Sequence, residues 1–145
     1  MLRLLLLTLA LLLAGCDSRP QFVNTDISEA GYARDFALTD HNGKPRTMAD
    51  FRGKAVVIFF GYTQCPDVCP TTMTGMAEAM KLLGGDAAKV QVLFVTVDPE
   101  RDTQQLLAQY VPVFNPSFLG LFADAQTIAR TAQEFRVFYK KQPGS

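Results

Sequence analysis

The chain is 145 residues long, and 48% of its residues are hydrophobic while 19% are charged. This size and composition fit one globular domain with a hydrophobic core. Its 14 lysine and arginine residues balance its 14 aspartate and glutamate residues. Because such a balance gives no electrostatic attraction to a phosphate backbone, we expect no nucleic-acid partner.

The N-terminal segment, residues 1–15, has the pattern of a secretory signal peptide. Arg3 precedes the apolar run Leu4 to Leu13, which is too short to cross a bilayer. The ending Leu13-Ala14-Gly15-Cys16 resembles a bacterial lipobox, in which cleavage leaves Cys16 at the N-terminus and lipid is attached to its sulfur. The alternative is an ordinary cysteine just beyond a conventional cleavage site.

Residues 16–33 are polar, lack a clear periodicity and are predicted to form a tether. Residues 34–145 are then the predicted domain. We expect it to be lipid-anchored to the membrane of a bacterial cell envelope and to face the extracytoplasmic space. Thiols in that oxidising space need a reductant or a metal to stay reduced.

The first predicted elements are a hairpin and a buried strand. Phe36 and Leu38 alternate with polar residues, Asn42-Gly43 is typical of a two-residue hairpin turn, and residues 46–48 are expected to return as the partner strand. The unbroken apolar stretch from Ala55 to Tyr62 predicts a strand buried on both faces.

A helix is predicted to follow Pro70, which suits a first helical turn because it has no N–H to satisfy. Apolar residues recur at helical spacing up to the pair Gly84-Gly85, which is expected to end the helix. They are Met73, Met76, Ala77, Met80 and Leu83. The methionines could be thioether ligands, but their spacing favours core packing. Val90 to Val97 predicts a second strand, so that strand, helix and strand form one βαβ unit with a parallel pair.

Two helices and a short strand are predicted for the rest of the chain. Asp102, with Gln105 three residues later, is expected to cap a helix over Thr103 to Val111. Phe118 to Phe122 predicts a short strand, and Ala125 to Phe135 an amphipathic helix. The predicted fold class is therefore α/β.

The chemistry of the chain is expected to lie at Cys65 and Cys69, where the first buried strand passes into its helix. Two thiols at such a turn could share one metal ion or form one disulfide. We expect the start of the helix to lower the pKa of Cys69, and two soft thiolates suit Cu(I) or Zn(II). The alternative is a permanent disulfide that only braces the turn, although so short a loop gives little stabilisation.

Three charged residues nearby have open roles. Asp98 and Arg101 either line the mouth of the dithiol or form a local ion pair that shapes their loop. Asp67 lies between the two cysteines and could steer a metal or a partner, although a solvated turn carboxylate is the default interpretation.

Two sequence blocks together closely resemble the SCO/SenC family. The first runs from Phe59 to Pro70 and contains Cys65-Pro66-Asp67-Val68-Cys69-Pro70, and the second is Val95 to Thr103. The resemblance extends from about Phe36 to Tyr139 and includes the turn Asp50 to Lys54. It implies a membrane-tethered, thioredoxin-like protein that binds copper through Cys65 and Cys69. The implied task is to help build the CuA centre of cytochrome c oxidase.

The sequence departs from the family in one respect. The family supplies a third copper ligand, a histidine in an Asp-His-Ser segment downstream of the helix matching Ala125 to Phe135, and this sequence ends at Ser145 before reaching it. We therefore expect a C-terminally truncated family member that lacks the final antiparallel strands and the last helix of the fold. The single histidine, His41, could replace the missing ligand, but we favour a solvated turn residue.

The sequence is compatible with three functions. The first is a copper metallochaperone, with Cu(I) favoured over Cu(II) because two thiolates are soft ligands. The second is a thiol-disulfide oxidoreductase that keeps oxidase cysteines reduced, although Cys-x-x-Cys is the usual spacing for that chemistry. The third is an inactive, truncated remnant. The expected partners are the oxidase subunit that carries CuA, other copper carriers or thiol reductants, and the membrane through the lipid anchor.

Overall fold

The computed structural model describes residues 23–140, and the chain divides between Ala30 and Gly31 into two compact units. In the described part of the first unit, the Asp26 carboxylate accepts hydrogen bonds from the Ser28 N–H and hydroxyl at 2.9 and 2.6 Å. The Ala30 N–H donates to the Ile27 carbonyl at 2.8 Å. These residues form local turns, and every described helix and strand lies in the second unit.

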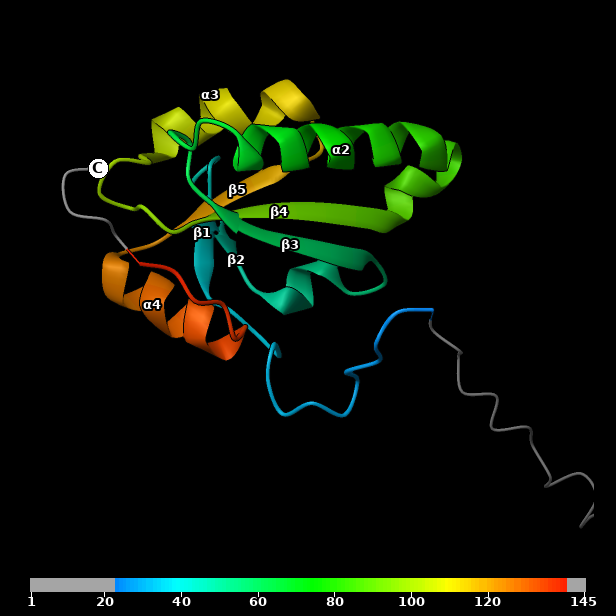
Figure 1. Cartoon of the computed structure of the whole chain (residues 1–145), viewed down its shortest axis with the longest axis horizontal. Helices are drawn as coiled ribbons and strands as arrows, with labels where there is room; N and C mark the ends of the chain where they lie inside the picture. Colours follow the sequence, from blue (N-terminus) through cyan, green and yellow to red (C-terminus); the bar gives the residue numbers. More distant parts are fainter. Residues whose placement is uncertain (1–22, 141–145) are drawn as a thin grey trace, which may run out of the picture. The chain divides into compact units, whose positions relative to one another are not determined.

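The second unit is a five-stranded mixed sheet with helices on both faces (Figure 1). The strand order is β2-β1-β5-β4-β3, with β3, β4 and β5 parallel and β1 antiparallel to both of its neighbours. The strands are β1 (Leu38–Asp40), β2 (Pro45–Arg46), β3 (Ala55–Gly61), β4 (Val90–Thr96) and β5 (Leu119–Phe122). The helices are α2 (Val68–Leu83), α3 (Gln104–Phe114) and α4 (Ala125–Glu134), with short 3-10 helices η1 (Met48–Phe51) and η2 (Gly84–Lys89).

The predicted βαβ unit is present as β3, α2 and β4. The two strands pair in parallel from Ala55 opposite Val90 to Gly61 opposite Thr96. α2 ends at Leu83 and is capped by Gly84, whose φ of 53° lies in the left-handed region that favours glycine. Because parallel strands end at the same edge of a sheet, the loop after Gly61 and the loop after Thr96 lie beside each other.

The core consists of two hydrophobic clusters, one on each face of the sheet. α2 and α3 cover one face, while α4 and η1 cover the other (Figure 1). Alternate residues of β4 supply both clusters, as expected for a strand whose side chains point in turn to opposite faces. Met73 and Met80 are buried and Met76 packs against the first cluster, so the prediction of core methionines is confirmed.

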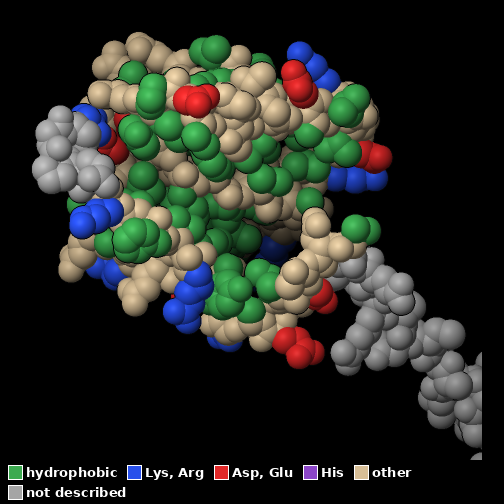
Figure 2. All heavy atoms as spheres, in the orientation of Figure 1, with side chains coloured by type: hydrophobic (Ala, Val, Ile, Leu, Met, Phe, Trp, Pro, Cys, Tyr) green, Lys and Arg blue, Asp and Glu red, His purple; other side chains and the backbone are tan. Residues whose placement is uncertain are grey.

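The first buried strand differs from its prediction. Only Gly61 of β3 is buried, and the side chain of Val57 is 38% exposed. Among the described strands β3 pairs with β4 alone, so one side of it has no strand neighbour. Figure 2 shows hydrophobic side chains gathered where Figure 1 places β3, between the two helical layers. The apolar run therefore predicted the strand but not its exposure.

The return strand of the hairpin and the start of α3 also differ from their predictions. The return strand is Pro45–Arg46, because Thr47 and Asp50 form a capping box that starts η1. Thr103, rather than Asp102, caps α3, and its hydroxyl accepts the Leu106 N–H at 3.2 Å. α4 begins after Asp124, whose carboxylate accepts the Thr127 N–H at 2.9 Å.

No helix within residues 23–140 has the length and apolar character needed to span a membrane.

Candidate metal centre

The structure brings the two predicted thiols together where β3 passes into α2. Cys65 lies in the loop and is partly exposed, whereas Cys69 is the second residue of α2 and is buried. Both are free thiols. The Cys69 N–H donates to the Cys65 sulfur at 3.4 Å, and the Cys65 N–H donates to the Tyr62 carbonyl at 3.3 Å. The first turn of α2 thus holds the pair in one compact loop.

Hydrogen bonds make Cys65 the more acidic thiol. Partial burial opposes its ionisation, but donors at its sulfur outweigh this effect and lower its pKa. The donors are the Cys69 thiol, the N–H groups of Cys69 and Asp67, and the Tyr62 hydroxyl. The start of the helix therefore stabilises the Cys65 thiolate, since its free N–H groups reach that sulfur.

The prediction of a lowered pKa for Cys69 is wrong. Burial, together with the thiol's hydrogen bond to Cys65, raises the pKa of Cys69 to about 11. The Tyr62 N–H donates to the Cys69 sulfur and acts to lower its pKa. The charges of Cys65 and Asp102 raise the pKa further. Cys69 sits at the helix start as expected, but its side chain turns into the apolar core, where a charge is costly.

The Cys69 sulfur lies close to Gly61 at the end of β3. A Cβ added to Gly61 would lie 3.1 Å from the Cys69 sulfur and 3.0 Å from the Phe94 ring. It would also lie 2.9 Å from the Phe59 ring, so a side chain at this position would force the neighbouring rings or the sulfur to shift.

Asp102 connects the dithiol loop to the end of β4. It is 1% exposed, and its carboxylate accepts hydrogen bonds from the Thr63 N–H at 3.0 Å, the Thr63 hydroxyl at 2.6 Å and the Thr96 hydroxyl at 2.7 Å. Sequence reasoning assigned this residue to a helix cap and missed the role. One indication of this role was present in the sequence: Asp102 follows a buried strand, and residues that follow parallel strands often gather at one edge of the sheet.

The structure shows the contacts of the other charged residues near the loop. Arg101 and Asp98 form an ion pair, and the Asp98 N–H donates to the Thr96 hydroxyl at 3.0 Å. Of the two open alternatives, the local ion pair is therefore present, and the charge of Arg101 also acts on Tyr62. Asp67 is exposed at the N-cap of α2, where its carboxylate accepts the Thr71 hydroxyl at 3.4 Å.

Tyr62 is a second residue of the site that the sequence did not single out. Its hydroxyl donates to the Cys65 sulfur, and the charge of Cys65 and partial burial raise the pKa of the phenol. The aromatic residue directly after the strand and three positions before Cys65 was the only indication of this contact.

His41 is buried, so the prediction of a solvated turn residue is wrong. Its side chain is 8% exposed, and its Nδ1 accepts the Gly120 N–H at 2.9 Å. Burial lowers its pKa, although the charge of Asp40 acts in the opposite direction. Within residues 23–140, no group of three or more His, Cys, Asp or Glu side chains is arranged to hold a metal ion. His41 therefore joins no such group with Cys65 and Cys69.

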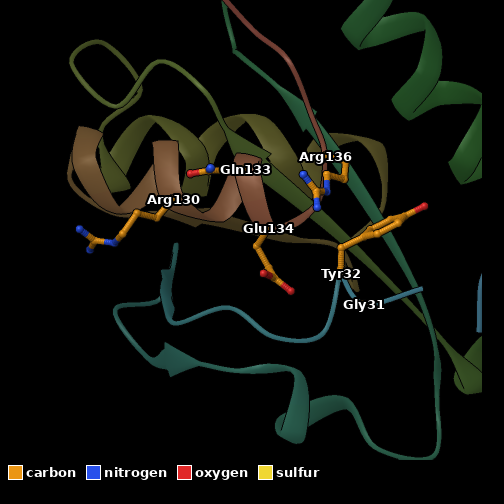
Figure 3. A pocket seen from close by; sticks show the side chains of 6 residues that line it. All are labelled: Gly31, Tyr32, Arg130, Gln133, Glu134 and Arg136. Carbon is orange, nitrogen blue, oxygen red and sulfur yellow. The ribbon is translucent and has the colours of Figure 1, made fainter. Parts of the chain in front are cut away.

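A separate hollow of about 220 Å³ lies between α4 and the segment before β1 (Figure 3). Arg136 lies over the ring of Tyr32 at 5.6 Å, and Glu134 accepts the Arg34 N–H at 3.1 Å. Neither cysteine lines this hollow. Cys16, the predicted lipidation site, lies outside the described residues.

Residues 24–145 match the SCO1/SenC family. The chain belongs to this family. Its fold is the thioredoxin-like α/β fold of the SCO proteins, as predicted. The match includes both cysteines and the block around Asp102.

Known SCO proteins are similar in sequence and in structure. A mitochondrial SCO2 homologue from Bos taurus is 44% identical over 111 residues, which are 75% of this chain and 42% of the relative. The chain thus spans less than half the length of that relative. The copper-bound structure of Bradyrhizobium japonicum ScoI is 45% identical with a TM-score of 0.72, covering 76% of this chain and 70% of that one. Copper-bound yeast Sco1 is 31% identical with a TM-score of 0.69, covering 77% and 65% respectively.

Proposed function

We propose that this chain is a copper metallochaperone that holds its cargo between the thiolates of Cys65 and Cys69. The observation that carries the proposal is the free dithiol at the start of α2, in which the Cys65 sulfur accepts the Cys69 N–H at 3.4 Å. The copper-bound structures of two SCO relatives support copper as the cargo.

The donor set favours Cu(I) as the oxidation state. Thiolates are soft ligands, and Cu(I) prefers them, whereas Cu(II) prefers nitrogen and oxygen donors in a tetragonal arrangement. Within residues 23–140 no larger group of His, Cys, Asp or Glu is available to supply such donors. The two sulfurs fit Cu(I) without a further ligand from this part of the chain.

The unequal exposure of the two thiols suggests how the cargo moves. Cys65 is partly exposed and is the more acidic thiol, so it is the ligand that incoming copper and an acceptor protein reach first. Cys69 is buried and holds the ion from the core side. Transfer then proceeds by exchange of one thiolate at a time for a ligand of the acceptor.

We further propose that the acceptor is the cytochrome c oxidase subunit that carries CuA, with other copper carriers or thiol reductants as upstream partners. Family membership supports this assignment. A lipid on Cys16 would anchor the chain to the bacterial membrane, with residues 34–145 in the extracytoplasmic space and residues 16–33 as a tether.

An anaerobic Cu(I) competition titration of the reduced full chain tests the copper site. We expect one tightly bound Cu(I), and we expect it to be lost in the double variant Cys65→Ser/Cys69→Ser because no thiolate pair remains. The matched control is Cys16→Ser, which removes the third cysteine and should bind as the unmodified chain does. Equal binding by the double variant and the unmodified chain would contradict the proposal.

One observation favours thiol-disulfide exchange as a second candidate function. A partly exposed thiol with a lowered pKa beside a buried thiol with a raised pKa is the division expected between an attacking and a resolving cysteine. Turnover of a mixed-disulfide substrate by the copper-free chain tests this candidate. Turnover that is lost in Cys65→Ser would support it, and no turnover would exclude it.

A further inference from the structure

Two neighbouring hollows open beside α4, and they differ in chemistry. The first is the polar hollow of about 220 Å³ described above. The second, of about 590 Å³, opens beside residues 137–140 and is lined mainly by apolar side chains. These apolar side chains include Ala129, Ala132, Val137 and Phe138. Gln133 and Arg136 line both hollows, so a polar and an apolar depression meet on one surface.

Basic side chains surround the two hollows. Arg130 and Arg136 line the polar hollow, and Lys140 lines the apolar one. All three are exposed, and the ion pairs that form between residues of the described range involve other side chains. Glu134 is the acidic residue that lines the polar hollow, and its carboxylate accepts the Arg34 N–H at 3.1 Å. The surface therefore carries an excess of positive charge.

The two arginines are spread over this surface rather than aimed at one point. Arg136 follows the end of α4 with a φ of 55°, and its guanidinium lies over the ring of Tyr32 at 5.6 Å. Arg130 extends away from Arg136, with Glu134 between them (Figure 3). Because the two guanidinium groups do not converge, they suit anions distributed over a surface better than one small anion.

Phe138 is an exposed aromatic residue between two of these charges. It is 89% exposed and lies between Arg136 and Lys140 in the chain. Figure 2 shows lysine and arginine side chains around hydrophobic ones in the region where Figure 1 places α4 and the residues that follow it. An aromatic ring flanked by basic side chains suits the interface of an anionic membrane, where the ring enters the headgroup layer and the cations contact phosphates.

We propose that the α4 face, formed by Arg130, Arg136, Phe138 and Lys140, docks on the anionic phospholipid surface of the membrane. Cys16, the proposed lipidation site, lies 16 positions before Tyr32, which lines the polar hollow. An anchor at Cys16 would therefore hold this hollow within at most about 55 Å of the bilayer. Such a tether raises the local concentration of phospholipid, so a weak contact is enough. The inference uses the proposed attachment at Cys16 and does not depend on copper.

Docking through the α4 face leaves the dithiol accessible. α2, which carries Cys69, covers the opposite face of the sheet from α4 (Figure 1). The sheet therefore separates α2 from a membrane in contact with α4. The contact would set the direction in which the dithiol loop faces an acceptor without covering the loop.

A single tryptophan placed on the α4 face tests the docking, because the chain has no tryptophan of its own. We expect the emission of the copper-free full chain carrying Phe138→Trp to shift to shorter wavelength with vesicles of equal parts phosphatidylcholine and phosphatidylglycerol. Pure phosphatidylcholine should give no shift, and about 1 M NaCl should remove it, since the Debye length is then about 3 Å. The matched control is Leu82→Trp, because Leu82 is 90% exposed near the end of α2. A shift in both variants, or in neither, would overturn the proposal.

Paired charge variants test the role of the arginines. In the Phe138→Trp background, Arg130→Gln/Arg136→Gln should lower the ratio of docked to undocked chains about thirtyfold, because each basic side chain near an anionic surface contributes a factor of about five. Lys81→Gln/Lys89→Gln removes the same charge from exposed positions in α2 and η2 and should keep the shift. Equal losses in the two double variants would show attraction by net charge alone and would contradict a specific face.

Two further arms separate the alternatives. Inorganic phosphate without vesicles should leave the emission unchanged, and a shift with phosphate but not with vesicles would replace the docking face with a small-anion site. Cys65→Ser/Cys69→Ser should dock as the chain with both cysteines does. Failure of the Cu(I) titration therefore leaves the docking result standing, and a missing emission shift leaves the proposed copper site standing.

Discussion

Cys65 and Cys69 lie four positions apart in the same turn, yet their thiols differ strongly in acidity. Hydrogen bonds from the helix start and from Tyr62 lower the pKa of Cys65, whereas burial raises that of Cys69 to about 11. The direction in which each side chain points, into the loop or into the core, decides which thiol the helix N–H groups stabilise. Position along the helix alone does not decide it.

His41 makes a testable contribution to stability at the residue scale. Its folded pKa lies below the unfolded value of 6.5, because burial disfavours the charged ring and Nδ1 must accept the Gly120 N–H. The unfolded chain therefore takes up a proton more readily as the pH falls. The contribution of His41 is present above about pH 6.5 and is lost as the pH falls toward the folded pKa.

The variant His41→Asn tests this sign. The asparagine oxygen can accept the Gly120 N–H but does not titrate, and the variant has no other histidine. Between about pH 7.5 and about pH 5.5, we expect the unmodified chain to lose more unfolding free energy than the variant, by at most about 1.4 kcal/mol, the limit that the unfolded pKa sets. Urea unfolding at both pH values measures this difference. An equal loss in both proteins would show that His41 does not contribute.

At the scale of elements, the site depends on how closely α2 approaches the end of β3. Gly61 ends the strand, and the Cys69 sulfur and the Phe94 ring occupy the space where a side chain would otherwise lie. Gly75, in the middle of α2, has open space at the same position. The two glycines therefore differ in what an added methyl group would meet.

We expect Gly61→Ala to lower the unfolding free energy by about 2 kcal/mol, because the methyl group overpacks the contact between strand and helix. We expect Gly75→Ala to raise it by about 0.5 kcal/mol, because alanine favours the helix more than glycine does. Urea unfolding of the two variants gives both values. Equal effects would mean that Gly61 is not required for the approach of Cys69.

At the scale of the whole second unit, β4 joins the two halves of the core. Val92 and Phe94 belong to the cluster under α2 and α3, while Leu93 and Val95 belong to the cluster under α4 and η1. Because neighbouring residues of one strand serve both clusters, neither cluster keeps its full set of contacts when the other is lost.

We therefore expect the full chain to unfold in one cooperative transition. Met73→Ala on one face and Ile128→Ala on the other should each lower the unfolding free energy by about 3 kcal/mol. Each should shift the midpoint of the same single transition to a lower urea concentration. Far-ultraviolet circular dichroism and tyrosine fluorescence should report the same transition. Two separate transitions, each sensitive to one variant, would contradict this expectation, and the absence of any transition would favour an inactive remnant.

The sequence alone determined the local features of this protein. The apolar stretch of β3, the helical spacing of the methionines and the second apolar stretch predicted the βαβ unit. The spacing of Cys65 and Cys69 located the dithiol at the junction of strand and helix, and the two sequence blocks indicated the family. These features could be predicted because periodicity, turn preference and motif spacing are carried by residues close together in the chain.

The tertiary structure decided the features that depend on distant partners. Asp102 is held by Thr63, 39 positions away, and His41 by Gly120, 79 positions away. The partial exposure of β3 and the raised pKa of Cys69 likewise depend on which elements surround them. Burial and long-range hydrogen bonds arise only when the strands and helices pack, so residue order within one element could not reveal them.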